Sequence, residues 1–326
     1  MKVLHIAAGL SSKERPHHQP FIKSQIDSLK KEGVDCRVYE IKSYNSKLEY
    51  FKSIQVIRNL ITENNYDILH AHYSYCGFST YFASSNKPIV LSFMGSDLLG
   101  TPNIQGVLTT RGKIDKFISS FVAKRMNHLI VKSEQMKNLL PIQVPISVIP
   151  NGIDFDIFKP IDRNKSRKIL GFKENDFIVL FLGNVKQPVK NFNLTKKAVE
   201  SFKKENDGVK LITPFGISQH QVVEYMNTSD VLMLSSFWEG SPNVIKEAMA
   251  CNLPIISTKV GDVETVMQDA YNCFTVDFSE GEIIDKLRII YESKKRSNGR
   301  EKIDHLRNEV IAQKIIEVYK SVLSTK

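Results

Sequence analysis

Two glutamates with seven residues between them, Glu239 and Glu247, are the first candidates for chemistry in this chain. Glu239 follows an apolar run and precedes Gly240, whereas Glu247 lies among apolar residues with helical periodicity. Because burying a lone carboxylate is costly, Glu247 needs a partner or a ligand. Its neighbours three and four residues away carry no positive charge, so two alternatives stay open: an ion pair with a distant lysine or arginine, or two vicinal ribose hydroxyls.

The residues between the two glutamates have the pattern of a helix start. Ser241 is a suitable N-cap and Pro242 a suitable first helical residue, and the helix is expected to end near Asn252. Its first turn, with Asn243 and Val244, presents backbone N–H groups and a positive dipole end at the carboxyl edge of the preceding strand. The sequence therefore predicts a diphosphate-binding site at this turn.

Short apolar runs alternate with helix-period segments through the 326 residues, a length that fits two domains. The expected strands are 3–8, 34–41, 67–72, 88–93, 128–133, 177–183, 209–213, 230–236 and 254–259. The expected helices are 21–33, 47–64, 76–85, 112–127, 191–205, 218–228 and 242–251, with further helices at the C-terminus. This order predicts an α/β protein with two doubly wound parallel sheets and a cleft between the domains. The turn-rich stretch 144–160 is interpreted as the linker, so the domains are 1–152 and 153–326, and the last helix is expected to be able to pack on the first domain.

The composition, 42% hydrophobic and 25% charged, is that of a globular protein. No apolar run approaches the roughly 18–20 residues of a membrane span. The N-terminus has the pattern of a first strand and not of a secretory signal. The four cysteines are scattered and never spaced as CxxC, so we expect reduced thiols, a cytoplasmic location and no zinc site.

Positive charge is concentrated in the first half of the chain. Residues 1–150 hold 19 Lys+Arg against 11 Asp+Glu, whereas the remainder holds 26 against 24. This balance fits an anionic membrane surface or lipid phosphate, and equally an ordinary basic surface; we expect no nucleic acid partner. Segment 111–125 mixes basic and apolar residues at near-helical spacing, which fits either peripheral attachment to the inner face of a membrane or an amphipathic helix packed on the sheet.

A family resemblance rests on the segment EGSPNVIKEAMACNLPII, which begins at Glu239. Further motifs, in order along most of the chain, are HAHY (70–73), GSD (95–97), VIPNGID (148–154), FLGN (181–184) followed by Lys190, and VGDVE (260–264). This pattern resembles the retaining glycosyltransferases of family 4, which have the GT-B fold of two Rossmann-like domains. The resemblance implies a nucleotide-sugar as co-substrate, no cofactor or metal ion, and a glycan or lipid-linked acceptor in cell-surface polysaccharide or glycolipid synthesis. It also implies an acceptor-side first domain and a donor-binding second domain.

The resemblance assigns roles by position. Glu247 would bind the donor ribose, and Glu239 would contact hydroxyls of the transferred sugar. The backbone from Gly240 to Val244 would approach the sugar and the pyrophosphate. Gly9, in the first strand–helix loop, would allow the backbone to approach the phosphates, and Gly183 belongs to the loop that should carry cations.

That loop departs from the family. Lys190 matches the family's lysine, so we predict a catalytic role for it together with Glu239. Where the family usually has an arginine after Gly183, this chain has Asn184. Lys186 is then either a substitute or a solvated loop residue, and a lysine lacks the bidentate fork of a guanidinium.

A second departure concerns the acceptor or sugar side, where our candidates are His72, Gly95 and Asp97. The family often has a histidine before Gly-x-Asp, whereas this chain has Met94, whose thioether is only a weak acceptor. His72 either replaces that contact or is structural. The basic loop that contains residues 15–18 either meets the acceptor or is solvated.

The resemblance implies front-face attack on the anomeric carbon, with the leaving phosphate taking the acceptor's proton. The alternative function is a catalytically silent nucleotide-sugar-binding protein. A nicotinamide-dependent oxidoreductase would need GxGxxG after the first strand, which residues 9–14 lack. The DFD triplet at 154–156 lies in the expected linker, so we interpret its likeness to a metal motif as coincidental.

Overall fold

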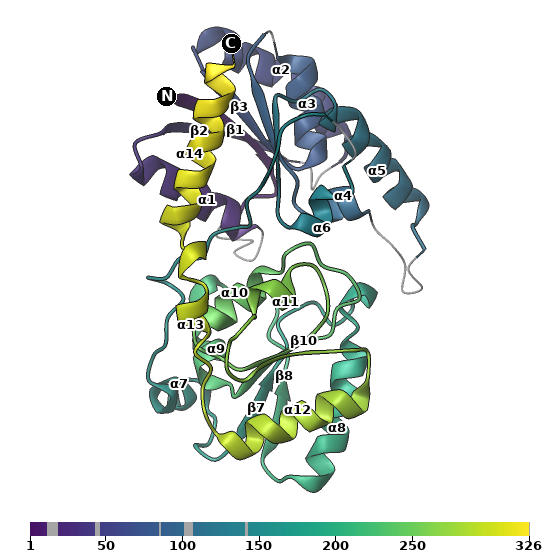
Figure 1. Ribbon diagram of the computed structural model, residues 1–326, viewed down its shortest axis with the longest axis vertical. Coiled ribbons are helices and arrows are strands. Elements are labelled where there is room, and N and C mark those ends of the chain that lie inside the picture. The colour runs from purple at the N-terminus through teal and green to yellow at the C-terminus, as the bar shows by residue number, and fades with distance from the viewer. Residues whose placement is uncertain (12–18, 43–45, 85, 101–106, 141–142, 326) are drawn as a thin grey trace. The chain divides into compact units, whose positions relative to one another are not determined.

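The computed structural model describes residues 1–11, 19–42, 46–84, 86–100, 107–140 and 143–325 (Figure 1). The chain divides into two compact units, one of Met1–Gly152 with Asn308–Lys326 and one of Ile153–Arg307. The C-terminal helix α14 (Asn308–Ser324) therefore belongs to the first unit, where it packs against α1 (Pro20–Lys31). Each unit is built on one parallel sheet.

The first sheet has six strands in the order β2-β1-β3-β4-β5-β6. The strands are β1 (Lys2–Ala8), β2 (Asp35–Ile41), β3 (Ile68–His72), β4 (Ile89–Ser92), β5 (His128–Val131) and β6 (Ile146–Val148). The central strands are buried, which is why they are visible in the sequence as continuous apolar runs. β6 corrects our interpretation of 144–160 as linker alone: Leu129 of β5 pairs with Ile146, and three half-buried residues are too few to show a period.

Helices cover this sheet on both faces. Besides α1 and α14 they are α2 (Leu48–Glu63), α3 (Ser74–Ala83), α4 (Ser96–Leu99), α5 (Thr110–Ala123) and α6 (Glu134–Lys137). One face carries a large apolar core that includes Leu4, Leu69 and Leu91. Across the described ranges, the helices are each too short or too polar to cross a bilayer.

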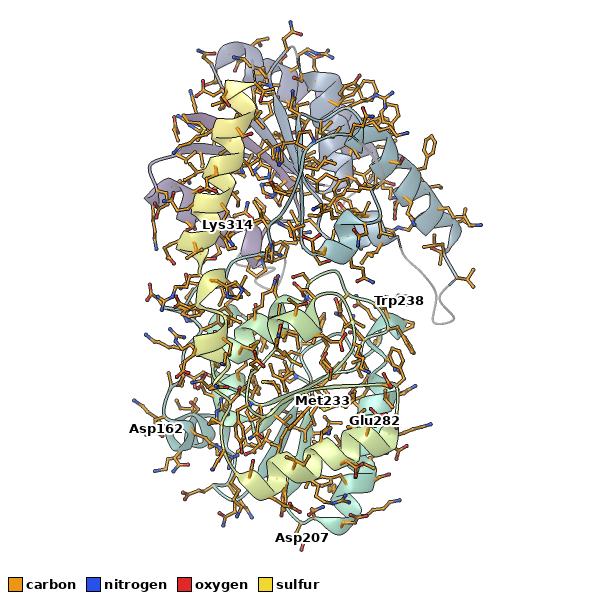
Figure 2. The ribbon with its side chains drawn as sticks, in the orientation of Figure 1. Asp162, Asp207, Met233, Trp238, Glu282 and Lys314 are labelled. Atoms are coloured by element: carbon orange, nitrogen blue, oxygen red, sulfur yellow. The ribbon has the colours of Figure 1, made fainter. Side chains whose placement is uncertain are left out.

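The second sheet has five strands in the order β11-β10-β9-β7-β8. They are β7 (Phe177–Leu180), β8 (Val209–Ile212), β9 (Val231–Leu234), β10 (Ile255–Thr258) and β11 (Cys273–Val276). Figure 2 shows Met233 of β9 in the interior of this unit and Trp238, four residues after the strand ends, at its surface. We did not predict β11, because it is an edge strand whose residues are mostly half-buried.

The helices of the second unit follow the strand–helix rhythm. They are α7 (Arg163–Leu170), α8 (Phe192–Glu205), α9 (Gln219–Thr228), α10 (Asn243–Ala250), α11 (Val263–Val266), α12 (Glu280–Ser293) and α13 (Gly299–Lys302), with short 3₁₀ turns η1 (Pro188–Lys190) and η2 (Asp304–Leu306). Since β7, β9 and β10 adjoin and run parallel, the loops after them leave the same edge of the sheet. The loops after β7 and β9, together with α10, hold most of the candidate residues.

Candidate functional site

Lys190 and Glu239 form an ion pair at this edge. The Nζ atom of Lys190 donates to Oε1 of Glu239 at 2.7 Å, and the Ser236 hydroxyl donates to the same oxygen at 2.8 Å. The two charged side chains are 25% and 18% exposed, respectively, so solvent or a ligand reaches both. Because both bonds use Oε1, a ligand would meet Oε2 of Glu239 and the remaining N–H groups of Lys190. This arrangement places a carboxylate that can accept hydrogen bonds from hydroxyls beside an ammonium of the kind that can bind phosphate.

Backbone contacts lock these loops together. The N–H of Phe237 donates to Val189 at 2.8 Å, and the Ser235 hydroxyl donates to the carbonyl of Asn191 at 3.0 Å. The last residue of β10 joins them, because the Thr258 hydroxyl donates to the carbonyl of Ser236 at 2.7 Å. The position of Glu239 is therefore set by three neighbouring strands, which is the rigidity that a binding site needs.

Two glycines allow close approach in this region. Gly261 has φ +57°, and a Cβ there would lie 2.6 Å from the carbonyl oxygen of Gly240 and 3.0 Å from that of Glu239. Gly183 borders Lys190, since its Cβ would lie 3.8 Å from Cδ of that lysine. A side chain at 261 would push the Glu239 loop away, so this position requires glycine.

The start of α10 corrects our expectation about Ser241. The N-cap is Pro242, with φ −70° and ψ 116°, and the helix begins at Asn243, followed by Val244. The Ser241 hydroxyl is engaged elsewhere: it accepts from Nζ of Lys246 at 2.6 Å and donates to Oδ2 of Asp262 at 2.6 Å. The fixed φ of proline suits both the N-cap and the first helical position. The shift of one residue therefore leaves the first turn of the helix where the sequence predicts it.

Glu247 is half-buried inside α10. No side chain in the described ranges hydrogen-bonds to its carboxylate, so the ion pair with a distant cation that we considered is not found there. Burial raises the pKa of Glu247 to about 7, and the neighbouring Lys246 ammonium opposes the rise. The ionised carboxylate of Glu247 can accept two hydrogen bonds from a diol. Its role in binding the donor ribose stays a prediction.

The remaining donor-side candidates lie in turns. The side chain of Asn184 accepts from the N–H of Lys186 at 3.0 Å, which shapes the loop, while the side chain of Lys186 is exposed. Gly9 follows β1 with φ 65°, a conformation that favours glycine. The basic positions Arg15, His17 and His18 lie outside the described residues.

Asp97, expected on the acceptor or sugar side, is fully buried. Its carboxylate accepts from the backbone N–H groups of Ser74, Met94 and Gly95, each at 3.0 Å, and of Leu98 at 3.2 Å. Burial raises the pKa of Asp97 to about 6, and these bonds oppose the rise. The carboxylate thus shapes the loop that holds Gly95 (φ 120°), and this geometry disfavours a direct contact with a sugar.

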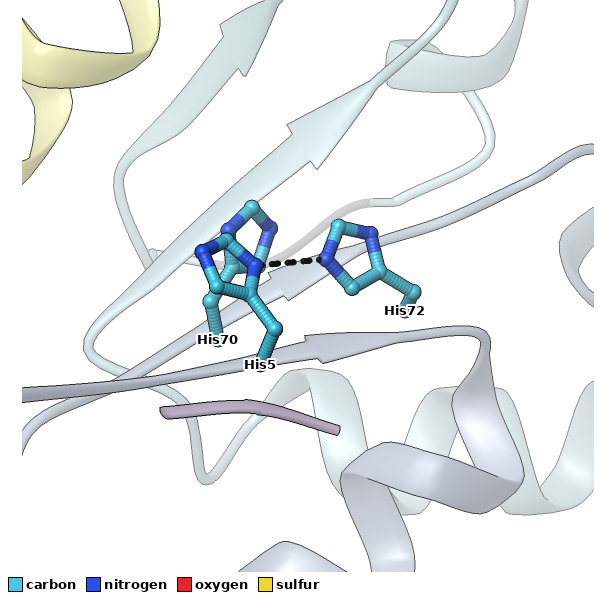
Figure 3. Close-up of side chains that lie close together, drawn as sticks. All are labelled: His5, His70 and His72. Carbon is cyan, nitrogen blue, oxygen red and sulfur yellow. Dashed lines mark hydrogen bonds between the residues drawn. The ribbon is translucent and has the colours of Figure 1, made fainter. Parts of the chain in front are cut away.

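His72 lies in a buried cluster with His5 and His70 (Figure 3). The strand register places His5 of β1 beside His70 of β3, and Nδ1 of His5 lies 3.0 Å from Nε2 of His72. His70 bonds through Nδ1 to the Tyr319 hydroxyl of α14 at 2.5 Å and through Nε2 to Ser92 at 2.8 Å. Burial lowers the pKa of all three imidazoles far below the ordinary value, so they are neutral at physiological pH.

This cluster has the residue types of a transition-metal site, with ligand atoms within 4.8 Å of one another. Its geometry fits a metal poorly. Both nitrogens of His70 already have partners, and the His70 and His72 rings stack with centroids 4.2 Å apart, so their nitrogen lone pairs do not converge. The Lys132 ammonium also lies close enough to lower their pKa values. The arrangement favours the structural interpretation of His72, as part of a polar layer between the sheet and α14.

Sequence reasoning missed Lys246 and Asp262. Lys246 is fully buried, although its position directly before Glu247 gave no sign of it. Asp262 lies in the VGDVE motif, but its contact with Ser241 joins residues 21 positions apart.

Two family models match the chain: "Glycosyltransferase Family 4" at residues 5–157 and "Glycosyl transferases group 1" at 208–304. A curated relative, the UDP-Gal:alpha-D-GlcNAc-diphosphoundecaprenol alpha-1,3-galactosyltransferase of Escherichia coli, is 25% identical over 72% of this chain and 68% of its own length. A putative teichuronic acid biosynthesis glycosyltransferase of Bacillus subtilis is 25% identical over 82% of this chain and 83% of its own length.

Solved structures agree on the fold. A sucrose-phosphate synthase from Thermosynechococcus elongatus superposes with a TM-score of 0.80 at 16% identity, covering 99% of this chain and 100% of that one. Anabaena HepE in complex with UDP-glucose superposes with a TM-score of 0.72 at 17% identity, covering 98% and 100%.

Proposed function

Because the chain belongs to glycosyltransferase family 4, with the GT-B fold, we propose that it transfers a sugar from a nucleotide-sugar donor to a glycan or lipid-linked acceptor, with retention at the anomeric carbon. The observation that carries the proposal is the ion pair of Lys190 and Glu239 at the carboxyl edge of the second sheet. It sets a cation for the diphosphate beside a carboxylate for sugar hydroxyls. The first turn of α10 follows Glu239 in the chain and supplies backbone N–H groups.

The proposed chemistry needs charge stabilisation and positioning. The acceptor hydroxyl oxygen bonds to the anomeric carbon as the bond from that carbon to the phosphate oxygen breaks, and the hydroxyl proton passes to the leaving phosphate. Lys190 and the α10 N-terminus stabilise the charge that develops on the diphosphate, and Glu239 orients the sugar. Since these groups neutralise the leaving group, we propose that no metal ion is required.

We propose a UDP-hexose as the donor. The Escherichia coli relative is named for UDP-Gal, and the Anabaena structure contains UDP-glucose. The half-buried carboxylate of Glu247 suits the ribose of such a nucleotide, and the exposed Lys186 would add a second cation near the phosphates in place of the missing arginine.

A lipid-linked acceptor would place the protein at the cytoplasmic face of a membrane, and α5 supports this. We considered an amphipathic helix that packs its apolar side on the sheet. As that interpretation requires, α5 buries Val122 and Ala123 in the apolar core of the first unit, but it also leaves Phe117 73% exposed and Ile114 51%. Apolar side chains exposed among lysines suit an anionic bilayer surface. We therefore propose peripheral attachment through α5 in synthesis of a cell-surface polysaccharide or glycolipid.

The test is a donor and acceptor panel. Purified protein is titrated calorimetrically with UDP-, GDP-, ADP- and dTDP-hexoses and then incubated with undecaprenyl-diphosphate-linked sugars, with and without EDTA. We expect UDP-hexose binding and an α-linked product from an α-linked donor, unchanged by EDTA. A β-linked product would exclude retention. Binding without sugar release to any acceptor or to water would favour the silent nucleotide-sugar binder.

A further inference from the structure

Asp262 occupies the N-cap position of α11 but does not cap it. An aspartate at an N-cap normally accepts a hydrogen bond from a backbone N–H of the first turn. Here the carboxylate turns away, and its Oδ2 atom accepts from the Ser241 hydroxyl at 2.6 Å. The side chain thus points to the loop that carries Glu239.

Lys246 supports the contact between Ser241 and Asp262 through a hydrogen bond to Ser241. Its side chain is fully buried, and its Nζ atom donates to the Ser241 hydroxyl at 2.6 Å. Ser241 therefore receives a hydrogen bond from a cation and gives one to Asp262, which fixes the orientation of the carboxylate. Burial raises the pKa of Asp262, whereas the charge of Lys246 and the bond from Ser241 lower it.

The other carboxylate oxygen of Asp262 accepts no hydrogen bond from the described residues. Its Oδ1 atom is buried and has no hydrogen-bond partner in the described part of the chain. A buried acceptor without a partner is unfavourable, and native structures contain few of them. The oxygen lies near the donor loop, because the adjacent Gly261 approaches the carbonyls of Glu239 and Gly240 too closely for a Cβ.

A hydroxyl of the donor is the ligand group that fits this oxygen. A carboxylate accepts hydrogen bonds and repels phosphate, so the diphosphate is not its partner. The ribose diol has Glu247, which lies in α10 without a side-chain partner among the described residues. The transferred sugar is the remaining part of the donor that could bind Asp262. Glu239 is the residue assigned to the hydroxyls of this sugar, and Gly261, next to Asp262, closely approaches the Glu239 carbonyl.

Building on the proposed function, we propose that Asp262 is a further donor-binding residue whose Oδ1 accepts a hydrogen bond from a hydroxyl of the transferred sugar. Lys246 and Ser241 are the positioning residues that hold it. Which sugars the enzyme accepts would then depend on this carboxylate as well as on Glu239.

The test compares Asp262→Asn with the wild type by calorimetric titration. The ligands are the nucleotide-hexose of the UDP, GDP, ADP and dTDP panel that the wild type binds most tightly, and the matching nucleoside diphosphate. We expect the Kd for the nucleotide-hexose to rise about tenfold or more, the effect of losing a hydrogen bond to a charged group. The Kd for the diphosphate, which lacks the hexose, should change less than about twofold. Asp269→Asn, an exposed aspartate in the turn after α11, is the matched control and should leave both values unchanged.

The Ser241→Ala variant distinguishes a direct contact of Asp262 with the sugar from a role in which Asp262 only supports the loop. This change breaks the hydrogen bond to Oδ2 but leaves the Asp262 carboxylate in place. The ratio of the Kd for the diphosphate to the Kd for the nucleotide-hexose should therefore be larger in Ser241→Ala than in Asp262→Asn. Equal loss of both ligands in Asp262→Asn, or identical ratios in the two variants, would overturn the assignment to the sugar. Unchanged binding in Asp262→Asn would overturn this inference alone. A wild type that binds no ligand of the panel would overturn the proposed function, and this inference with it.

Discussion

The ammonium of Lys190 lies 2.7 Å from Oε1 of Glu239, and the two residues come from the loops after β7 and β9, which are neighbouring strands. The family resemblance predicts that they serve different parts of one donor, the diphosphate and the transferred sugar. In the structure they contact each other, so each charge helps to hold the other in place. Effects of changing the two residues should therefore be coupled and not additive.

Lys190→Ala should lower kcat/KM for the donor at least tenfold, which corresponds to about 1.4 kcal/mol of transition-state stabilisation. Glu239→Gln should also lower kcat/KM, because the neutral amide cannot form an ion pair with the Lys190 ammonium. It is also a weaker acceptor than the carboxylate for hydrogen bonds from sugar hydroxyls. The double variant should lose less than the product of the two factors. Steady-state product formation from the donor measures all three.

The matched control is Lys196→Ala. Lys196 is an exposed lysine of α8 that pairs with Glu200 at 3.7 Å, so its removal should leave kcat/KM within about twofold of wild type. Near-wild-type kinetics in Lys190→Ala would refute its role in catalysis.

Glu247 predicts a pH dependence of stability. Its pKa is about 7 in the folded chain against an ordinary value of 4.5, so between these values the folded chain binds more protons than the unfolded chain. Its contribution to stability is therefore complete below pH 4.5 and is lost as pH rises through 7. Glu247→Gln cannot ionise, so it should be more stable than wild type at pH 8 by on the order of 2–3 kcal/mol.

Urea unfolding at pH 5 and pH 8 measures this difference. The gap between Glu247→Gln and wild type should widen from pH 5 to pH 8, and an equal gap at both values would contradict the raised pKa. Donor binding should change in the opposite sense, because the ionised carboxylate is the better acceptor for ribose hydroxyls. Wild-type affinity for the donor should rise between pH 6 and 8, and Glu247→Gln should bind weakly at both.

The sequence predicts the framework of the site well, for a physical reason. Buried parallel strands are continuous apolar runs, and their carboxyl ends must share one edge, so Lys190 and Glu239 are expected near each other. The one-residue error at Pro242 arises because proline fits two adjacent positions of a helix start. The edge strands β6 and β11 escaped because their half-buried residues give no continuous apolar signal.

The polar contacts of the site could not be predicted in this way. Lys246 has the residue type of a surface position, and only tertiary packing brings it against Ser241. Asp97 resembles a ligand-binding aspartate in its motif, yet its bonds go to the backbone of its own loop and of Ser74, which lies 23 positions earlier. Such pairings depend on side-chain direction and register, which sequence spacing does not determine.

Gly261→Ala should damage activity more than stability. The residue has φ +57°, and a Cβ would lie 2.6 Å from the Gly240 carbonyl oxygen, so the Glu239 loop must shift to admit it. Gly216→Ala is the matched control, because Gly216 has φ +74° but nothing within 4 Å of its Cβ. Gly216→Ala should lose about 1 kcal/mol of unfolding free energy from backbone strain, and Gly261→Ala should lose more because the loop must also shift. Only Gly261→Ala should also lose at least tenfold in kcat/KM, and equal kinetics in the two variants would show that this close approach does not position Glu239.

Exposed apolar residues of α5 predict attachment to membranes. Ile114→Ser and Phe117→Ser should each weaken co-sedimentation with vesicles of phosphatidylglycerol and phosphatidylcholine about tenfold, since burying such a side chain contributes roughly 1.5–3 kcal/mol. Ile169→Ser is the matched control: Ile169 is 63% exposed on α7 of the second unit and should have no effect. Binding should also weaken as salt rises and with vesicles of phosphatidylcholine alone, because Lys113 and Lys116 flank the apolar pair. If the α5 variants sediment like Ile169→Ser, attachment through this helix is excluded, and another surface must supply any contact with a lipid-linked acceptor.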